Sequence, residues 1–378
     1  MRKNAFTSFC SKLIGVSLFL TGCSVAHEPC RSIDNKHPIC GTSRPEDIAR
    51  IPGQPLLIIS EMGDPLNHLT PGGLSLLNTN TNTFTPLDPY TINTTRDNSD
   101  HRWGDPLCST SPPVILSPHG IHLSARSDDR MQLLVINHGS REAVEYFEVS
   151  QIGDTITVTW KGCVNPTPAT FLNNIVSLSN GGFIASQAYD YDAFSIGALN
   201  IELIKGVLGW DTGYLFEWNT AQGFTKIPGS NGPFVNGVAI SDDEESVYAT
   251  YYMGDEVRKI HRSSGERLAT MTIPQPDNLT WTTDGQLLVA SHQGYLVEKL
   301  LCLLTAESAC TFQFGIYTLD ADSLNSTEII NHKGYPMGGV TVATQLDSSL
   351  YLGSYSGDRV MRIPFPKHHV NKLENTYE

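Results

Sequence analysis

The sequence lacks the motifs that most directly assign an enzyme class. It has no G-x-S-x-G, which argues against a serine hydrolase of the α/β type. It has no C-x-x-C, which argues against a thiolate zinc site. Charged residues are scarce at 17%, and 39 acidic residues outnumber 25 basic ones. No long amphipathic helix pattern follows the first residues, while many short apolar runs between glycines and prolines favour β-structure.

The N-terminal segment predicts export. The basic start MRKN, with Lys12, precedes the apolar run LIGVSLFL, which is too short to span a membrane. The run ends in LTGC, which resembles a bacterial lipobox. Residues 1–22 are therefore interpreted as a lipoprotein signal peptide and Cys23 as the lipidated mature N-terminus, with ordinary secretion as the alternative. We expect a lipid-anchored protein of the bacterial cell envelope, periplasmic or surface-exposed. Ser24 favours the outer membrane, although the inner membrane stays open.

Loss of this segment makes the chain more acidic. It removes Arg2, Lys3 and Lys12 and no acidic residue, which takes the formal net charge from −14 to −17. Attachment to a membrane would therefore depend on acyl chains rather than on charge, and no nucleic-acid partner is expected.

The remaining cysteines agree with export. Apart from Cys10 in the signal segment and Cys23, the chain has an even number, which in an oxidising compartment predicts disulfides. We expect cysteines that are close in the sequence to form disulfides with each other, and the two cysteines that remain to form the third bond. The predicted bonds are Cys30–Cys40, Cys302–Cys310 and Cys108–Cys163.

Six related segments follow one another along most of the chain. Each begins with a polar residue or glycine, continues with the period-two alternation of a β-strand, and leads through a turn into a second strand. They are spaced by roughly forty to seventy residues, which is typical of a β-propeller. The segments are EDIARI at Glu46, HGIHLS at His119, NNIVSLS at Asn173, NGVAIS at Asn236, DNLTWT at Asp277 and GGVTVA at Gly338.

The predicted fold is therefore an all-β, six-bladed propeller over residues 44–366. Residues 23–43 are interpreted as a linker after Cys23, and residues 367–378 as a tail. A β-sandwich or a two-domain β-protein would not explain six similar units. The segment from Tyr295 to Thr305 is compatible with a short helix inserted in the fifth blade.

The first strand of each blade lines the central channel of a propeller, so the residues that begin these strands should converge on one axis. Glutamate, aspartate and asparagine recur at this position. Their oxygens are hard ligands suited to calcium, and the set has no thiolate or histidine cluster that would favour zinc or copper. The simpler interpretation is that asparagine and aspartate begin strands because they form turns.

The motifs PHGI at Pro118, VINH at Val135, LNNIV at Leu172, VNGVAIS at Val235 and PDNLT at Pro276 resemble those of the paraoxonases, an arylesterase and lactonase family. PED at Pro45 fits the same pattern, and the resemblance runs from about Arg44 to Pro364. Gluconolactonases share the fold more distantly. The resemblance implies a catalytic calcium in a central site. Its ligands here would be Glu46, Asn173, Asn236, Asp277 and Asn278.

The resemblance also implies a second, structural calcium, held by Asp47, the carbonyl of Ile121 and Asn174. The family has LND where this chain has LNN, so this second site should be weaker or empty. A disulfide joins the chain ends in the family. The tail from Pro364 has no cysteine, so closure of the ring should rest on strand pairing.

For catalysis, the resemblance assigns His119 as the base that activates water and His138 as its relay partner. Histidine titrates near neutral pH, which suits this task, although Asp277 could act as base instead. His292 is expected to line the substrate site. The predicted function is calcium-dependent hydrolysis of lactones and aryl esters. The alternatives are a non-catalytic envelope propeller with structural calcium and a sugar-lactone hydrolase.

Overall fold

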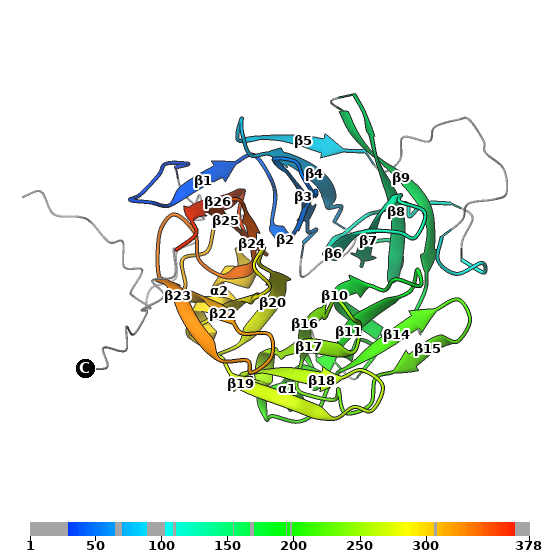
Figure 1. The fold of residues 1–378 in the computed structure, drawn as a ribbon. Coiled ribbons are helices and arrows are strands. Elements are labelled where there is room, and N and C mark those ends of the chain that lie inside the picture. The colour runs from blue at the N-terminus through cyan, green and yellow to red at the C-terminus, as the bar shows by residue number, and fades with distance from the viewer. Residues whose placement is uncertain are drawn as a thin grey trace, which may run out of the picture.

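The computed structural model describes residues 29–64, 70–88, 103–108, 111–153, 155–166, 170–193, 195–196, 199–305 and 308–366. The predictions for the signal peptide, for Cys23 and for the tail at 367–378 lie outside the described residues. Within them, six four-stranded antiparallel sheets surround a central axis (Figure 1). The predicted all-β, six-bladed propeller is confirmed.

In blades 1 to 5 the strands follow one another outward from the axis in chain order, whereas the outer strand of blade 6 comes from the N-terminal end of the propeller. Blade 1 contains β2 (Pro45–Arg50), β3 (Leu56–Glu61), β4 (Gly73–Asn78) and β5 (Thr83–Leu87); blade 2 contains β6 (Pro118–Ala125), β7 (Met131–Asn137), β8 (Ala143–Ile152) and β9 (Thr155–Val164); blade 3 contains β10 (Thr170–Ser177), β11 (Phe183–Asp190), β14 (Tyr214–Asn219) and β15 (Gly223–Lys226).

Blades 4 to 6 repeat this arrangement. Over the described residues, a small ribbon and one short helix lie between strands of blade 3, and one short helix lies between strands in each of blades 4 and 5. Blade 4 contains β16 (Val235–Ile240), β17 (Ser246–Tyr251), β18 (Glu256–His261) and β19 (Arg267–Thr272); blade 5 contains β20 (Pro276–Trp281), β21 (Leu287–His292), β22 (Phe314–Leu319) and β23 (Ser326–His332); blade 6 contains β24 (Val340–Leu346), β25 (Ser349–Ser354), β26 (Arg359–Pro364) and β1 (His37–Cys40). The other elements are β12 (Ser195–Ile196), β13 (Leu199–Asn200), α1 (Ile201–Val207), η1 (Tyr252–Gly254) and α2 (Leu296–Leu304).

The ring is closed by β1, which forms the outer strand of blade 6. It pairs with β26 in antiparallel register, with Ile39 opposite Val360. Strand pairing therefore joins the two ends of the propeller, as the sequence suggested. The predicted domain boundary needs a correction, because residues 37–40 belong to the propeller and not to the linker assigned to 23–43.

The hydrophobic core is divided among the interfaces between neighbouring blades. The cluster between blades 1 and 2, for example, contains Ile58, Leu133 and Phe147, all fully buried. Similar clusters lie at the other interfaces around the ring. Burying such a side chain contributes about 1.5–3 kcal/mol. The alternating apolar positions of the six sequence segments therefore hold the blades together and fix the axis.

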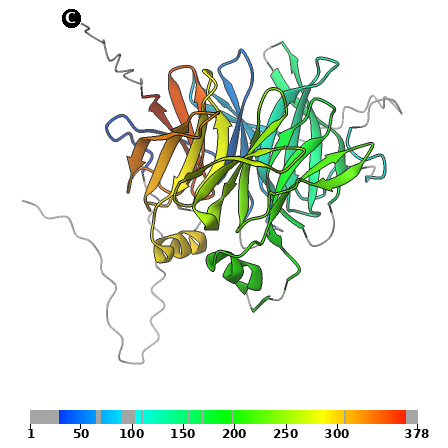
Figure 2. The same ribbon diagram turned by 60° about the horizontal axis from the view of Figure 1, so that its bottom comes forward.

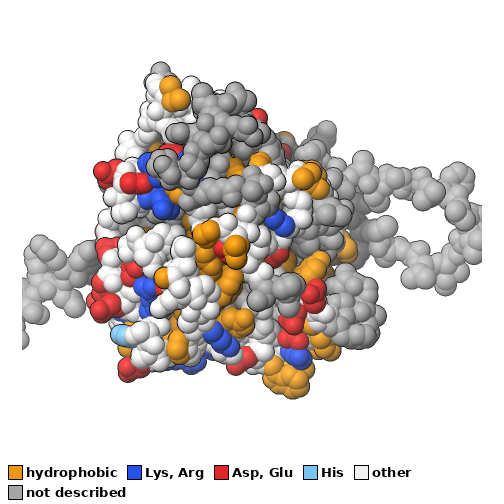
Figure 3. Space-filling view, turned by 90° about the vertical axis from the view of Figure 1, so that its right-hand side faces the viewer, with side chains coloured by type: hydrophobic (Ala, Val, Ile, Leu, Met, Phe, Trp, Pro, Cys, Tyr) orange, Lys and Arg blue, Asp and Glu red, His pale blue; other side chains and the backbone are white. Residues whose placement is uncertain are grey.

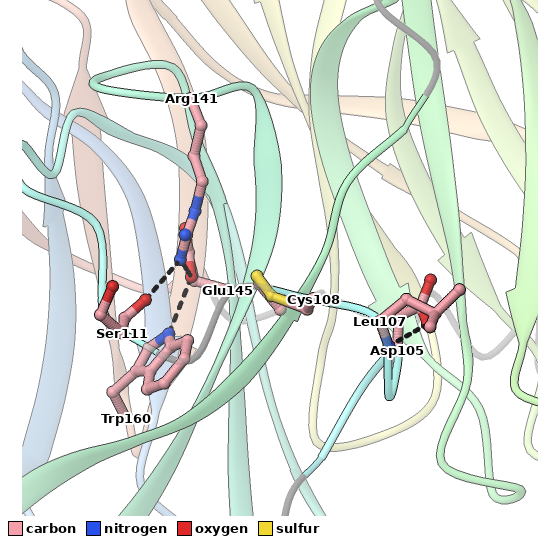
Figure 4. Close-up of a disulfide and its surroundings, with 8 residues drawn as sticks. Asp105, Leu107, Cys108, Ser111, Arg141, Glu145 and Trp160 are labelled. Carbon is pink, nitrogen blue, oxygen red and sulfur yellow. Dashed lines mark hydrogen bonds and ion pairs between the residues drawn. A yellow bond between two sulfur atoms is a disulfide. The ribbon is translucent and has the colours of Figure 1, made fainter.

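The three predicted disulfides are confirmed: Cys30–Cys40, Cys108–Cys163 and Cys302–Cys310. The second ties the segment before blade 2 to β9. Next to it, the buried carboxylate of Glu145 pairs with Arg141 at 2.7 Å and accepts a hydrogen bond from Trp160 at 2.8 Å (Figure 4).

Both α-helices protrude from the same face of the propeller (Figure 2). The side chain of Asn200 caps α1 by accepting a hydrogen bond from the amide of Glu202 at 2.8 Å. Helix α2 is inserted between β21 and β22 of blade 5, so the helix expected around Tyr295 to Thr305 is present. Over the described residues, no helix is both long enough and apolar enough to cross a membrane.

Candidate active site

The six inner strands share an irregularity close to their first residue. Pairing with the second strand shifts register there, as in a β-bulge, which takes the side chains at the shift out of the alternating pattern. The predicted donors and His119 all lie within these shifts. The shifts fall between Pro45 and Asp47, Pro118 and Ile121, Leu172 and Ile175, Val235 and Val238, Pro276 and Leu279, and Val340 and Val342.

Two glycines allow the bulged strands to approach one another. A Cβ on Gly120 would lie 2.6 Å from the carbonyl oxygen of Asn173, and one on Gly237 would lie 2.6 Å from that of Asp277. Both contacts are closer than a real Cβ tolerates. The glycines in HGI and NGV are therefore explained by backbone packing around the axis.

The structure brings the five predicted donors of the catalytic calcium together at one end of the channel. Each is at most 5% exposed. The side-chain nitrogen of Asn278, Nδ2, donates a hydrogen bond to Glu46 Oε1 at 3.0 Å. This bond joins blade 5 to blade 1 across the axis. Four oxygens of the set have no hydrogen-bond partner among the described residues. These atoms are Glu46 Oε2, Asn173 Oδ1, Asn236 Oδ1 and Asn278 Oδ1.

Unpaired buried oxygens are costly, so a cluster of four points to a group that they would hold. Carboxylate and amide oxygens together fit a hard cation such as calcium. Across the described residues, no group of three His, Cys, Asp or Glu side chains could hold a metal ion. A cation could therefore be held here only with the help of asparagine oxygens, which belong to three of the five predicted donors.

The carboxylate of Asp277 lies in an environment that disfavours its ionised form. Burial, and next the charge of Glu46, raise the pKa of Asp277 well above its usual value, while a hydrogen bond from Asn236 opposes the rise. A bound cation would reverse this balance by favouring the ionised carboxylate.

The residues predicted for a second calcium are linked by hydrogen bonds. Asp47 Oδ2 accepts from the amide of Ile121 at 2.8 Å and from the side-chain nitrogen of Asn174 at 3.3 Å. Asn174 Oδ1 in turn accepts from the amide of Val238 at 3.2 Å. Burial and then the charge of Glu46 raise the pKa of Asp47 to about 7. The second metal stays a prediction, and these hydrogen bonds favour the weak or empty site that LNN suggested.

A chain of three side chains lies beside the oxygen cluster. His119 Nδ1 is 2.9 Å from His138 Nε2, and His138 Nδ1 is 2.7 Å from Glu142 Oε2. The other ring nitrogen of His119, Nε2, is 3.6 Å from Glu46 Oε1. Burial lowers the pKa of His119, but the charge and hydrogen bond of Glu46, together with the charges of Asp47 and Glu142, outweigh burial and leave that pKa raised. The predicted histidine pair is therefore in hydrogen-bonding contact and adjoins the donor set.

Sequence reasoning missed two parts of this chain. Glu142 lies four residues after His138 and also accepts a hydrogen bond from the amide of Leu172 at 2.8 Å. The ring of Phe171 stacks on His138, with centroids 4.4 Å apart and planes at 4°. The position of Glu142, four residues after His138, could have indicated this hydrogen bond from the sequence. The stacking contact joins two blades, so no local sequence pattern indicates it.

His292, which was predicted to line the substrate site, is buried on the opposite side of the oxygen cluster. Its Nε2 is 3.6 Å from Asp277 Oδ2, and its Nδ1 lies 3.0 Å from the hydroxyl of Tyr252. Burial, and then the charge of Lys299, lower the pKa of His292 to about 3. This imidazole is therefore neutral at ordinary pH.

One cavity of about 520 Å³ is lined by the three histidines and by four members of the oxygen cluster, Glu46, Asn173, Asn236 and Asp277. Asn278, Glu142 and the residues predicted for the second calcium are not in its lining. Its walls are mainly apolar. The wall residues include Phe171, Phe234, Val207 at the end of α1, and Leu296, Leu300 and Leu303 of α2. A larger hollow, of about 1070 Å³, lies among the turns that end the inner strands and contains none of the predicted site residues.

Comparison with known proteins agrees with the fold and with the family resemblance. The family model for Arylesterase matches residues 106–358, more than half of the chain, including His119, His138 and every predicted donor of the catalytic calcium except Glu46. No curated protein matches the sequence.

Two solved structures show the fold alone, at low identity. A luciferin-regenerating enzyme is 14% identical with a TM-score of 0.51, covering 86% of this chain and 93% of its own. A gluconolactonase from Xanthomonas campestris is 13% identical with a TM-score of 0.50, covering 88% and 89%. The family match includes both histidines of the pair and four of the five predicted donors, and the chain is therefore an ester hydrolase that belongs to the arylesterase family.

Proposed function

We propose that this enzyme hydrolyses lactones and aryl esters, with one calcium ion held by five donors at the floor of the cavity. The observation that carries the proposal is the group of four buried oxygens without hydrogen-bond partners among the described residues, next to a pair of hydrogen-bonded histidines. The donors are Glu46, Asn173, Asn236, Asp277 and Asn278. Calcium bound there would polarise the ester carbonyl and stabilise the negative charge that develops on its oxygen.

The hydrogen-bond chain determines which nitrogen can act as base. An ionised Glu142 can only accept, so His138 carries its proton on Nδ1 and its Nε2 accepts from His119 Nδ1. The lone pair of His119 is then on Nε2, the nitrogen on the side of Glu46. His119 Nε2 takes a proton from the attacking water, and the charge it gains is stabilised through His138 by Glu142.

The walls of the cavity suggest the substituents that a substrate carries. Phe171, Val207 and Leu300 offer apolar surface above a polar floor. This arrangement favours an ester or lactone with an apolar group over a polyhydroxylated sugar lactone. His292, neutral and buried, packs the far side of the cavity and lines the bound substrate.

The proposal keeps the envelope location and the lipid anchor on Cys23. The predicted disulfides, now present in the structure, support an oxidising compartment. Mass spectrometry of membrane fractions would detect the lipid on Cys23, and an unmodified, secreted chain would contradict the anchor.

The test is hydrolysis of phenyl acetate and a panel of small lactones by the chain from Ser24 onward. The matched variants are His119→Gln and, as control, His37→Gln, which changes a histidine on β1, far from the cavity. We expect activity in the wild type and the control and a loss of at least about 100-fold in His119→Gln. Full activity in folded His119→Gln would remove the histidine from the mechanism. No activity in any form would favour a different ester class.

A further inference from the structure

One basic side chain lies in the wall of the cavity that contains the candidate site. Lys299, on α2, is the only lysine or arginine among the described residues of the lining. It is half-buried, and its ammonium nitrogen lies 6.0 Å from the ring centroid of Tyr252. Among the described residues, this nitrogen has no hydrogen-bond or ion-pair partner. The ammonium group is therefore available to a bound substrate.

The nearest acidic side chains are engaged with other donors. Asp255 Oδ1 accepts a hydrogen bond from the amide of Gln275 at 2.8 Å, and Glu298 pairs with Lys333 at 2.7 Å. By contrast, on the side of blades 2 and 3, several basic side chains lie at the surface close to acidic ones (Figure 3). An unpaired cation such as Lys299, half-buried in a cavity, indicates a role in function rather than in stability.

Lys299 faces the oxygen cluster from the side opposite the proposed base. Its helix is inserted in blade 5, whereas His119 lies in β6 of blade 2, and these two blades are opposite each other in the ring (Figure 1). After burial, the charge of Lys299 is the second cause of the lowered pKa of His292. Burial and then Glu46 raise the pKa of Asp277, and the charge of Lys299 opposes this rise. A carbonyl group bound above the cluster would therefore lie between His119 and Lys299.

Lys299 is better suited to donate a proton than the tyrosines of the lining. Burial raises the pKa of Tyr252 well above its usual value, and it also raises that of Tyr355. Burial has the opposite effect on an ammonium group, and it lowers the pKa of Lys299 to about 8, although nearby carboxylates oppose the decrease. Lys299 is thus protonated at neutral pH and is a stronger acid than an exposed lysine.

We propose that Lys299 is a catalytic residue that gives its proton to the leaving oxygen when the ester or lactone bond breaks. The inference rests on the hydrolysis proposed above. As His119 Nε2 takes a proton from water, the water oxygen bonds to the carbonyl carbon. The bond from this carbon to the leaving oxygen then breaks, its electron pair stays on the oxygen, and the proton of Lys299 joins it. Lys299 is left as a neutral amine, and a proton that passes through solvent from His119 restores both groups.

The need for this proton depends on the leaving group. The alkoxide released from an aliphatic lactone is nearly as basic as hydroxide, whose conjugate acid, water, has a pKa of about 15.7. Phenoxide resembles the tyrosine side chain, with a pKa of about 10, and nitrophenoxide is less basic still. Loss of the proton donor should therefore slow the hydrolysis of lactones most, of phenyl acetate less, and of nitrophenyl acetate least.

The test is hydrolysis of γ-butyrolactone, phenyl acetate and nitrophenyl acetate by variants of the chain from Ser24 onward, with calcium present. Lys299→Met removes the proton donor and nearly keeps the length of the side chain. Lys299→Arg keeps the positive charge, but a guanidinium does not release its proton at neutral pH. Lys205→Met on α1 is the control, because Lys205 pairs with Glu202 at 2.6 Å and is absent from the cavity lining. Circular dichroism and thermal melting verify that each variant is folded.

We expect both Lys299 variants to lose at least about 100-fold in kcat/KM for the lactone and less than about threefold for nitrophenyl acetate, while the control keeps wild-type rates. Equal losses on all three substrates would overturn the proposal, because they would indicate a structural role. A wild-type lactone rate in Lys299→Met would overturn it as well and leave the proposed hydrolysis intact. A lactone rate kept only by Lys299→Arg would assign the residue to charge recognition instead. A wild type inactive on every substrate would contradict the proposed function, and this inference with it.

Discussion

Replacement of Glu142 by glutamine tests the hydrogen-bond chain, because it removes a charge while keeping the shape of the side chain. Glu142 Oε2 lies 2.7 Å from His138 Nδ1, and Oε1 accepts from the amide of Leu172 at 2.8 Å. In Glu142→Gln, the glutamine oxygen can keep the bond to Leu172, which turns its NH2 group toward His138. His138 Nδ1 must then accept, and its Nε2 must donate to His119. The proton of His119 moves to Nε2, and the proposed base loses its lone pair.

The magnitude follows from the charged hydrogen bond that is lost, about 1.5–3 kcal/mol. Since about 1.4 kcal/mol corresponds to a tenfold change in rate, kcat should fall roughly 10- to 100-fold. KM should stay within about twofold, because Glu142 is absent from the cavity lining. Steady-state hydrolysis of phenyl acetate measures both constants, with Glu298→Gln on α2 as the matched control. A wild-type kcat in folded Glu142→Gln would refute the assigned direction of these hydrogen bonds.

Three further predictions concern the donors, the ring closure and α2. Asn236→Ala should weaken calcium binding at least about tenfold in calorimetry, since it removes one of the oxygens that have no hydrogen-bond partner among the described residues; an unchanged affinity would exclude it from the donor set. Ile39→Ala should lower the free energy of unfolding by about 2–4 kcal/mol in urea, because Ile39 is buried in the strand that closes the ring. A change below about 1 kcal/mol would mean that β1 contributes little to closure. Replacing Cys302 and Cys310 together by serine should cost about 2–3 kcal/mol and increase hydrogen exchange in α2, and unchanged exchange would show that the helix does not need the bond.

Much of the fold could be predicted because each blade repeats one local pattern. Period-two alternation after Asp277 or Asn236 is a property of a few consecutive residues, and six copies leave few alternatives. The family resemblance selected the residues predicted as calcium donors, and they meet in the structure because the repeat places equivalent residues at the same end of the channel. The cysteine pairs followed from their spacing in the chain.

Other features depend on contacts between segments that are distant in sequence. The strand β1 was assigned to a linker because four residues at 37–40 carry no repeat and become a strand only by pairing with β26. Phe171 was missed because its stacking on His138 joins blades 2 and 3. The exposed side of α2 was not anticipated either, since apolar residues such as Leu301 and Leu304 look like core residues until the structure shows their exposure.

The most direct test of the account is the calcium dependence of ester hydrolysis by the chain from Ser24 onward. Phenyl acetate turnover would be measured with calcium, after removal of the ion by a chelator, and after calcium is restored, with thermal melting recorded in each state. The account predicts that activity disappears on chelation and returns with the ion. It also predicts a lower melting temperature in the chelated form, because the buried donors near Asp277 then lack a partner. Full activity of a folded, fully chelated enzyme would contradict the assignment of the five donor residues to a catalytic calcium.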